Sequence, residues 1–457
     1  MSSKSKRVLT RLTIRDYPTI LSLSVCNLLL IIDSISLFES VKTGREAKMK
    51  CVKLLIITAG ITIWAGCKQE KTKMEKGTFG NDLKFLKKYT DVFVLSDKSG
   101  KSQVAVIPKY QGRIMTSTAE GGKGLSFGWL NRELIASDKF AEHINVFGGE
   151  DRFWLGPEGG QFSIFFKKDA PFDLEHWFTP APIDTEPFEL VSKSNNSAVL
   201  KKDMRLENYS GAIFTLRVDR KIRILEKGEA VIALGVTPTD TIKMVAFESN
   251  NKVTNTGTKP WEKQMGLLSI WILGMFNPSS ETTVVVPFHP GPETEFGPIV
   301  NDAYFGKAPT DRLAVKENVL FFSADGQYRS KIGLSPERAI SVIGSYDAIN
   351  KVLTIVWYNK PQGVIDFVNS MWQLQEHPYK GDVVNSYNDG PAEPGAKPLG
   401  PFYELETSSP AAKLKPGDSI THIHRTFHLQ GPEADLNAVA KAILTVSIDE
   451  VKLALSK

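Results

Sequence analysis

Cysteine is almost absent from this sequence. The chain has three, Cys26, Cys51 and Cys67, and none among residues 68–457. A large domain without thiols can fold in an oxidising compartment without mispaired disulfides, and it has no thiolate nucleophile. The absence therefore fits an exported protein and excludes cysteine chemistry from the body of the chain.

A motif for phosphate binding is also missing. The pairs Gly148-Gly149 and Gly159-Gly160 are not followed by Lys-Ser or Lys-Thr, as a phosphate-binding loop requires. The sequence indicates no cofactor.

The body of the chain lacks an excess of positive charge. The net charge is +5, but the first 66 residues hold ten Lys or Arg and four acids, so residues from Cys67 onward carry −1. Nucleic-acid phosphates call for a concentrated basic surface. We therefore expect no nucleic-acid partner.

The segment from Met49 to Cys67 resembles a bacterial lipoprotein signal. Two basic residues, Lys50 and Lys53, precede an apolar stretch over 54–64 that is too short to span a bilayer. Ala65 and Gly66 then lead into Cys67, whose thiol would take the diacylglycerol. Trp64 departs from the pattern, which has leucine there. An ordinary secretory signal and an uncleaved anchor are the alternatives.

The chain divides into five parts on this interpretation. The predicted parts are an over-extended gene start at 1–48, a signal peptide at 49–66, a charged tether at 67–88, a β-domain at 89–431 and a C-terminal helix at 432–457. Such a protein is expected in the cell envelope. It would be lipid-anchored to the membrane, on the periplasmic face or on the outer surface of a bacterial outer membrane.

Short runs that alternate apolar and polar residues predict an antiparallel all-β domain. The expected strands are 91–95, 103–107, 214–218, 221–225, 231–236, 283–287 and 352–357. Helical spacing is found at 432–455 and, more weakly, at 362–375. About 340 residues without an obvious linker predict one large sandwich of two sheets.

Three segments resemble the galactose mutarotase-like, or aldose epimerase, superfamily. They are Tyr110–Thr118 with Gly128–Asn131, then Phe147–Gly160, and finally Tyr403–Pro410 with Leu414–Asp418. The resemblance covers roughly residues 100–430. It implies a supersandwich of antiparallel strands whose concave face binds sugars. In the epimerases a glutamate takes the anomeric hydroxyl proton and a histidine protonates the ring oxygen.

Glu406 matches the glutamate of that superfamily, and His422 is the candidate acid. In extended strands Glu404 shares a face with Glu406, and His424 shares one with His422. The short Leu414–Asp418 turn predicts that all four side chains lie on the same concave face. A metal site of His422 and His424, or ordinary polar surface positions, are the alternatives.

Further candidates lie around the Gly-rich segment, Phe147–Gly160, and around the loop at 385–390. Arg and His donate hydrogen bonds to hydroxyl groups, and Trp offers a flat ring to the C–H side of a sugar. The predicted substrate-binding residues are His143, Glu150, Arg152, Trp154, His176, Trp177, Asn388, Glu404 and His424. A buried Glu150–Arg152 ion pair with Trp154 in the core is the competing interpretation.

Three functions remain open from the sequence. The first is a carbohydrate-binding lipoprotein, the second a sugar-active enzyme that uses Glu406 as base, and the third a structural lipoprotein. His143 and His176 are followed by Ile144 and Trp177, so the His-Gly pair usual in the epimerases is missing. The sequence therefore leaves catalysis undecided and favours binding.

Overall fold

The computed structural model describes residues 76–393 and 395–455, and the structural statements below concern these residues. They belong to a compact unit that starts at Met74. The expected upstream extension 1–48, the signal 49–66 and Cys67 lie outside the described residues.

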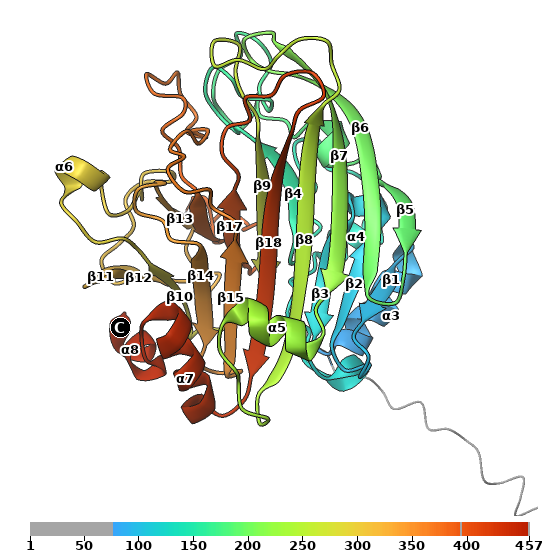
Figure 1. The fold of residues 1–457 in the computed structure, drawn as a ribbon, viewed down its shortest axis with the longest axis vertical. Coiled ribbons are helices and arrows are strands. Elements are labelled where there is room, and N and C mark those ends of the chain that lie inside the picture. The colour runs from blue at the N-terminus through green and yellow to red at the C-terminus, as the bar shows by residue number, and fades with distance from the viewer. Residues whose placement is uncertain (1–75, 394, 456–457) are drawn as a thin grey trace, which may run out of the picture. The chain divides into compact units, whose positions relative to one another are not determined.

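Antiparallel strands are the main regular structure of the described chain, and they form sheets of ten, five and three strands (Figure 1). The largest sheet has the order β11-β12-β10-β14-β15-β18-β8-β7-β6-β5. Its strands are β5 (Glu189–Lys193), β6 (Ser197–Glu207), β7 (Ile213–Ile224), β8 (Lys243–Asn255), β10 (Thr282–Pro287), β11 (Leu313–Lys316), β12 (Val319–Ser323), β14 (Val342–Asp347), β15 (Val352–Tyr358) and β18 (Ser419–Gln430).

The five-stranded sheet packs against one face of this large sheet. Its order is β13-β16-β17-β9-β4. Its strands are β4 (Arg152–Gly156), β9 (Ser269–Phe276), β13 (Ser330–Leu334), β16 (Val384–Asn388) and β17 (Tyr403–Ser408). Leu405 and Val384 of this sheet share a core with Val356 and Phe322 of the large sheet. This apolar layer joins the two sheets into a sandwich.

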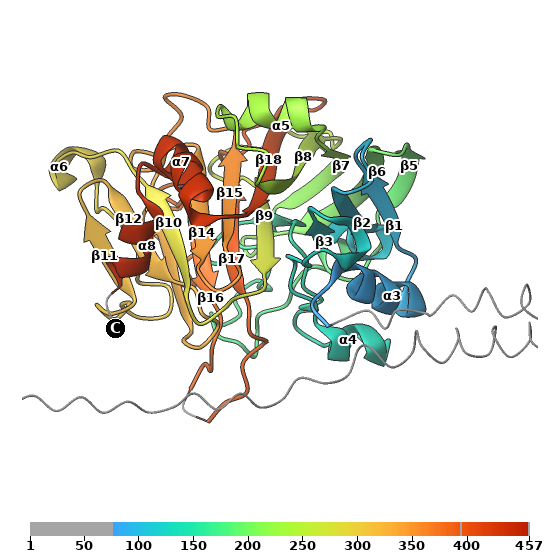
Figure 2. The same cartoon turned by 90° about the horizontal axis from the view of Figure 1, so that it is seen from below.

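Helices lie outside the sandwich. They are α3 (Phe79–Tyr89), α4 (Arg132–Ser137), α5 (Lys227–Leu234), α6 (Glu293–Phe296), α7 (Glu433–Leu444) and α8 (Ile448–Ala454), with single 3-10 turns at 108–110, 121–123 and 181–183. Figure 2 shows α5 and α7 on one face of the large sheet and β9, β16 and β17 on the other. No described helix is long and apolar enough to cross a membrane.

The three-stranded sheet is built by β1 (Phe93–Ser96), β2 (Gln103–Ile107) and β3 (Arg113–Thr118), with α3 packed against it. Phe79, Leu83 and Leu86 repeat at helical spacing, and Phe79 and Leu86 are fully buried in that packing. The predicted tether 67–88 is therefore wrong at its end, because α3 already belongs to the folded domain.

The long strands alternate as expected, with one correction. Phe214 and Leu216 of β7 point inward while Ile213 and Thr215 are exposed. The sequence predicted two strands at 214–218 and 221–225, but the structure has one continuous strand. No turn-forming Gly or Pro interrupts the alternation between the two predicted strands, so β7 continues through.

The large sheet ends at β5, where all five residues are exposed. Leu190 is 39% and Val191 is 52% exposed, and charged Glu189 and Lys193 stand at the two ends of the strand. The pairing with β6 shifts register between Leu190 and Ser192. This margin is therefore irregular and charged.

Helix predictions were partly right. The expected helix at 432–457 is split into α7 and α8, because Thr445 adopts a left-handed conformation and Ser447 caps α8 through the Glu450 amide. The predicted strand 231–236 is wrong, since α5 covers most of it. The predicted helix at 362–375 is also wrong: these residues form turns and loops.

The predicted fold class is confirmed. The domain is an antiparallel all-β sandwich with helices at its C-terminus. The third sheet and the helical start at Phe79 are additions that the sequence did not indicate.

Candidate ligand site

Strand β17 has two chemically different faces. Leu405 and Thr407 point into the sandwich, whereas Glu404 and Glu406 point away from it, to the outer face of the five-stranded sheet. This follows from the period of two in a strand. Loops cover that outer face, so Glu404 is only 5% exposed and Glu406 is fully buried.

Glu406 is held by two donors. Lys331 Nζ lies 2.9 Å from Glu406 Oε2, and Trp271 Nε1 donates to the same oxygen at 3.0 Å. Lys331 also lies over the Trp271 ring, 4.8 Å from its centroid. Glu406 Oε1 has no hydrogen-bond partner within the described part of the chain. One oxygen is thus fixed and the other is available to a ligand.

Glu404 and Arg152 form a looser pair. Arg152 Nη2 lies 3.6 Å from Glu404 Oε1, which is beyond hydrogen-bond distance. The guanidinium stacks on Trp154, 4.0 Å from the ring centroid. Among the described residues, Arg152 Nε and Nη1 have no hydrogen-bond partner although the side chain is buried. Arg152 is positioned by Trp154 and left with donors unused.

Burial shifts the protonation equilibria of this cluster. It raises the pKa of Glu404 to about 8, with the Glu406 charge acting in the same direction. It also raises the pKa of Glu158 to about 7. Burial lowers the pKa of Lys331, but Glu406 and then Glu158 more than offset it, so this pKa stands above its usual value. The site therefore holds a paired ammonium beside carboxyls that titrate near neutrality.

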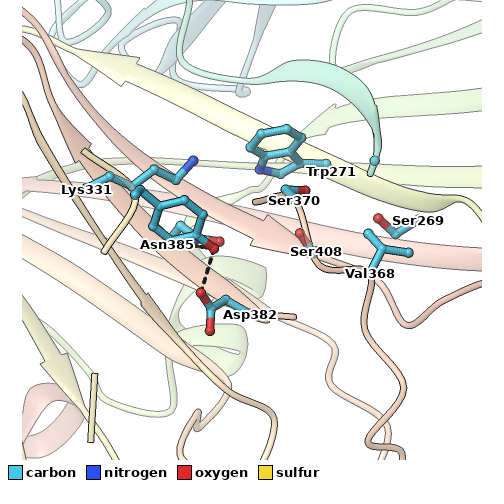
Figure 3. Close-up of a pocket in the computed structure, with 10 residues that line it drawn as sticks. Ser269, Trp271, Lys331, Val368, Ser370, Asp382, Asn385 and Ser408 are labelled. Carbon is cyan, nitrogen blue, oxygen red and sulfur yellow. Dashed lines mark hydrogen bonds between the residues drawn. The ribbon is translucent and has the colours of Figure 1, made fainter. Parts of the chain in front are cut away.

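A small pocket adjoins the Glu406–Lys331 pair. Its volume is about 10 Å³, roughly that of one water molecule. Trp271, Lys331, Asn385 and Ser408 line it, as Figure 3 shows. The other lining residues are Gly156, Ser269, Tyr304, Val368, Ser370 and Asp382. A sugar ring is larger than this space.

The polar wall of the pocket is organised around Asp382. Tyr304 donates its hydroxyl to Asp382 Oδ2 at 2.6 Å, and the Asn301 amide donates to the same oxygen at 2.9 Å. Burial raises the pKa of Asp382. On the opposite side, Ser269 Oγ has no hydrogen-bond partner in the described chain. Polar groups thus face the pocket from both sides.

Residues 361–382, called the covering segment below, close the site. The Glu158 amide donates to Ser370 Oγ at 3.1 Å. Gln161 and Gln375 exchange two hydrogen bonds, at 2.8 and 2.9 Å. A Cβ added at Gly159 would lie 2.4 Å from the Met371 carbonyl oxygen. The Gly-rich segment thus lies directly against the covering segment.

The expectation that Glu406 and His422 share a face is wrong. His422 and His424 belong to β18, in the other sheet, and both contact Thr407 Oγ1, at 2.8 and 2.9 Å. The parity of each strand was predicted correctly. However, residues 409–418 carry the chain from one sheet to the other instead of joining neighbours, so the histidines approach the back of β17.

The histidines are therefore core residues in this structure. Burial lowers the pKa of His422 to about 3 and that of His424 to about 4. His428 continues the row and lies 2.8 Å from Glu150 Oε2. Glu150 thus pairs with His428 inside the sandwich, and the alternative Glu150–Arg152 ion pair does not form. Asn388 also turns inward, where it donates to the Tyr328 carbonyl at 2.9 Å.

The remaining predicted residues lie near the Gly-rich segment. Trp177 packs within 6.5 Å of Trp154 and stacks on Trp372 at 5.6 Å between ring centroids. His143 contacts the Trp177 carbonyl oxygen through Nδ1, at 2.7 Å. His176 is partly exposed and pairs with Asp173. Of the predicted set, the structure brings together Arg152, Trp154, Glu404 and Glu406, with Trp177 behind them.

Sequence reasoning missed several members of this cluster. Lys331, Glu158, Tyr304, Asp382 and the site position of Trp271 were not predicted. Lys331 carried the only usable signal, because it alternates with the apolar Ile332 and Leu334 in a buried strand. Within the described residues, no group of three His, Cys, Asp or Glu side chains is arranged to hold a metal ion.

Fold and site together define the class of protein: an all-β sandwich with a buried cluster of carboxyls, cations and tryptophans. The chain belongs to the family described as "Family of unknown function (DUF6786)", which matches residues 77–455. A comparison with curated proteins finds no match.

Solved structures similar to this chain include galactose mutarotase-like proteins. A candidate aldose 1-epimerase from Escherichia coli K12 is 13% identical, with a TM-score of 0.44 over 75% of this chain and 99% of that one. A galactose mutarotase-like protein from Lactobacillus casei is 11% identical, with a TM-score of 0.42 over 74% and 100%. Sequence identities this low describe a likeness of fold and nothing about function.

Proposed function

We propose that this protein binds a carbohydrate on the outer face of the five-stranded sheet, at Arg152, Glu404, Glu406 and Lys331. The observation that carries this proposal is the set of buried, unused hydrogen-bonding atoms beside aromatic rings. Buried polar groups are normally satisfied, so unused ones at one place suggest a polar ligand. Glu406 Oε1 and two guanidinium nitrogens of Arg152 are such atoms.

The chemistry of the cluster suits a sugar. Each sugar hydroxyl donates and accepts a hydrogen bond, which carboxylates and guanidinium groups complement from the two sides. Charge-assisted hydrogen bonds of this kind contribute about 1.5–3 kcal/mol each. Trp271 and Trp154 add flat rings against which a C–H face can pack.

Ligand access requires the covering segment to move. The pocket of about 10 Å³ holds no sugar ring while Ser370 and Gln375 remain bound to the Gly-rich segment. These contacts are hydrogen bonds between loops, whose net contribution is small, about 1 kcal/mol each. Opening is therefore compatible with ordinary ligand affinities.

Binding can be tested with the full-length chain in detergent. We expect tryptophan fluorescence and isothermal titration calorimetry to detect a sugar from a panel of monosaccharides and oligosaccharides. Glu406→Gln should weaken this binding at least tenfold, whereas Glu189→Gln on the exposed strand β5 should not. A panel without any binding sugar would contradict the proposal.

A sugar-active enzyme is the second candidate, and the protonation of Glu404 favours it. A carboxyl with a pKa of about 8 is an acid at neutral pH, and it lies beside Glu406, which is charge-paired with Lys331. Ring opening needs one group to take the anomeric hydroxyl proton and another to protonate the ring oxygen. Glu406 would act as the base and Glu404 as the acid. Polarimetry of freshly dissolved α-glucose or α-galactose tests this, and an unchanged mutarotation rate argues for binding alone.

Anchoring through Cys67 is part of the proposal. The signal pattern at 49–67 supports a lipid-anchored protein of the cell envelope. The native chain should partition into detergent and begin at a modified Cys67 after processing. Cys67→Ser should abolish that processing. A mature chain that starts elsewhere would contradict the anchor and leave the sugar site untouched.

A further inference from the structure

Two kinds of buried cation lie near the site, and they differ in how they are neutralised. Lys331 lies 2.9 Å from Glu406, and Arg220 in the sandwich lies 2.6 Å from Asp151. Both have a carboxylate within hydrogen-bond distance. Arg152 has none among the described residues, since Glu404 stays at 3.6 Å.

Arg113 adds a second guanidinium without a carboxylate. It is fully buried and donates to the Gly148 carbonyl and to Gln111 Oε1, at 3.0 and 3.1 Å. It forms no ion pair among the described residues. The two guanidiniums are close enough that Arg152 helps to lower the pKa of Arg113, although burial is the larger cause. Asp184, which accepts a hydrogen bond from Asn145, favours the charged form of both guanidiniums but forms an ion pair with neither among the described residues. Two guanidiniums therefore share one such carboxylate, which leaves positive charge in excess at this end of the site.

The two carboxyls of β17 do not remove that excess at neutral pH. Burial raises the pKa of Glu404 to about 8, so it is mostly protonated at pH 7. Glu406 is already used by Lys331. A buried cation without a partner costs several kcal/mol, and a ligand that supplies the missing anion recovers that free energy.

We propose that the sugar bound at this site carries an anionic group, which Arg152 binds through Nε and Nη1, the nitrogens without a partner in the described part of the chain. This rests on the proposed carbohydrate-binding function and names the class of sugar. Stacking on Trp154 holds the guanidinium in place, so little side-chain entropy is lost when the anion binds. A carboxylate and a phosphate both fit a guanidinium, so uronic acids and sugar phosphates are the two sources of such a ligand.

The test compares matched sugars on the native full-length chain. Glucose, glucuronate and glucose 6-phosphate differ at one carbon, as do galactose, galacturonate and galactose 6-phosphate. We expect at least one anionic member of a set to bind ten times or more tighter than its neutral partner in calorimetry at pH 7. Whichever binds more tightly, the uronate or the sugar phosphate, identifies the class of ligand.

Arg152→Gln should remove the preference and leave anionic and neutral sugars within about twofold of each other. Arg217→Gln, an exposed arginine of β7 paired with Asp203, is the matched control and should keep it. Neutral sugars that bind as tightly as the anionic ones to the native chain would overturn the inference while leaving sugar binding intact. A chain that binds no sugar of either kind would instead overturn the proposed function. The native comparison decides the question even if Arg152→Gln does not fold.

Discussion

Thr407 Oγ1 lies 2.8 Å from His422 Nε2, on the side of β17 opposite to Glu406. One strand thus separates the buried histidines from the carboxyl cluster. The carboxyl cluster faces the covering segment and the histidines face the core, so changes on the two sides should have different effects.

The Glu406–Lys331 pair should matter for stability as well as for binding. Glu406→Gln leaves the Lys331 charge without its carboxylate, and breaking a buried ion pair costs about 3–5 kcal/mol. The double variant Glu406→Gln with Lys331→Met should recover most of that loss. Urea denaturation measures both. A single variant as stable as the native chain would show that the pair does not stabilise the fold.

Glu404 should lower the stability of the native fold as pH rises. Its pKa is raised from 4.5 to about 8, so the folded protein keeps a proton that the unfolded chain releases between these values. Its contribution is complete below pH 4.5 and is lost as pH rises towards 8. Glu404→Gln removes this dependence, so its stability relative to the native chain should rise by up to about 1.4 kcal/mol per pH unit in that window. Denaturant titrations at pH 5 and pH 8, with Glu189→Gln as control, measure the trend.

The buried histidines should act in the opposite direction. The pKa of His422 is lowered from 6.5 to about 3 and that of His424 to about 4, so the unfolded chain takes up protons that the folded one excludes. Their contribution is complete above pH 6.5 and is lost as pH falls towards these values. Replacing both by Gln should reduce the pH dependence of the free energy of unfolding by up to about 1.4 kcal/mol per pH unit for each histidine, as urea denaturation at several pH values would measure. Sugar affinity at pH 7 should change little, and a large loss would place the histidines in the site.

Gly159 is the position where an added methyl group should push the covering segment away from the Gly-rich segment. Gly159→Ala puts a Cβ 2.4 Å from the Met371 carbonyl oxygen, so one of the two backbones must move. We expect faster protease cleavage within 361–382. Gly228→Ala, in helix α5 with nothing within 4 Å of the added Cβ, is the control and should not change the cleavage rate. Equal cleavage in both variants would show that the contact does not hold the segment closed.

Local pattern was enough to predict which side chains share a face on the strands of the site. Glu404 and Glu406 share a face, as do His422 and His424, because strand parity is set within a few residues. Which sheet a strand joins is a long-range property. The link at 409–418 has the turn residues of a hairpin, yet it crosses between sheets, and no local signal distinguishes the two cases.

Lys331 shows a second limit of the sequence. A lysine in an apolar run is ordinarily a surface residue, and only its distant partner Glu406 makes burial tolerable. The two residues are 75 positions apart and meet through β16, which pairs with both of their strands. The sequence therefore predicted Glu404 and Glu406 but not the cation that holds Glu406.

The exposed strand β5 has a consequence for proteins held close together on a surface. A regular, flat margin would let a second copy continue the hydrogen-bond ladder of the large sheet. Glu189 and Lys193 at the ends of β5 and the register shift after Leu190 interrupt such a ladder. Copies crowded by the proposed lipid anchor would meet at this margin without extending one another's sheets, so high local density need not lead to aggregation.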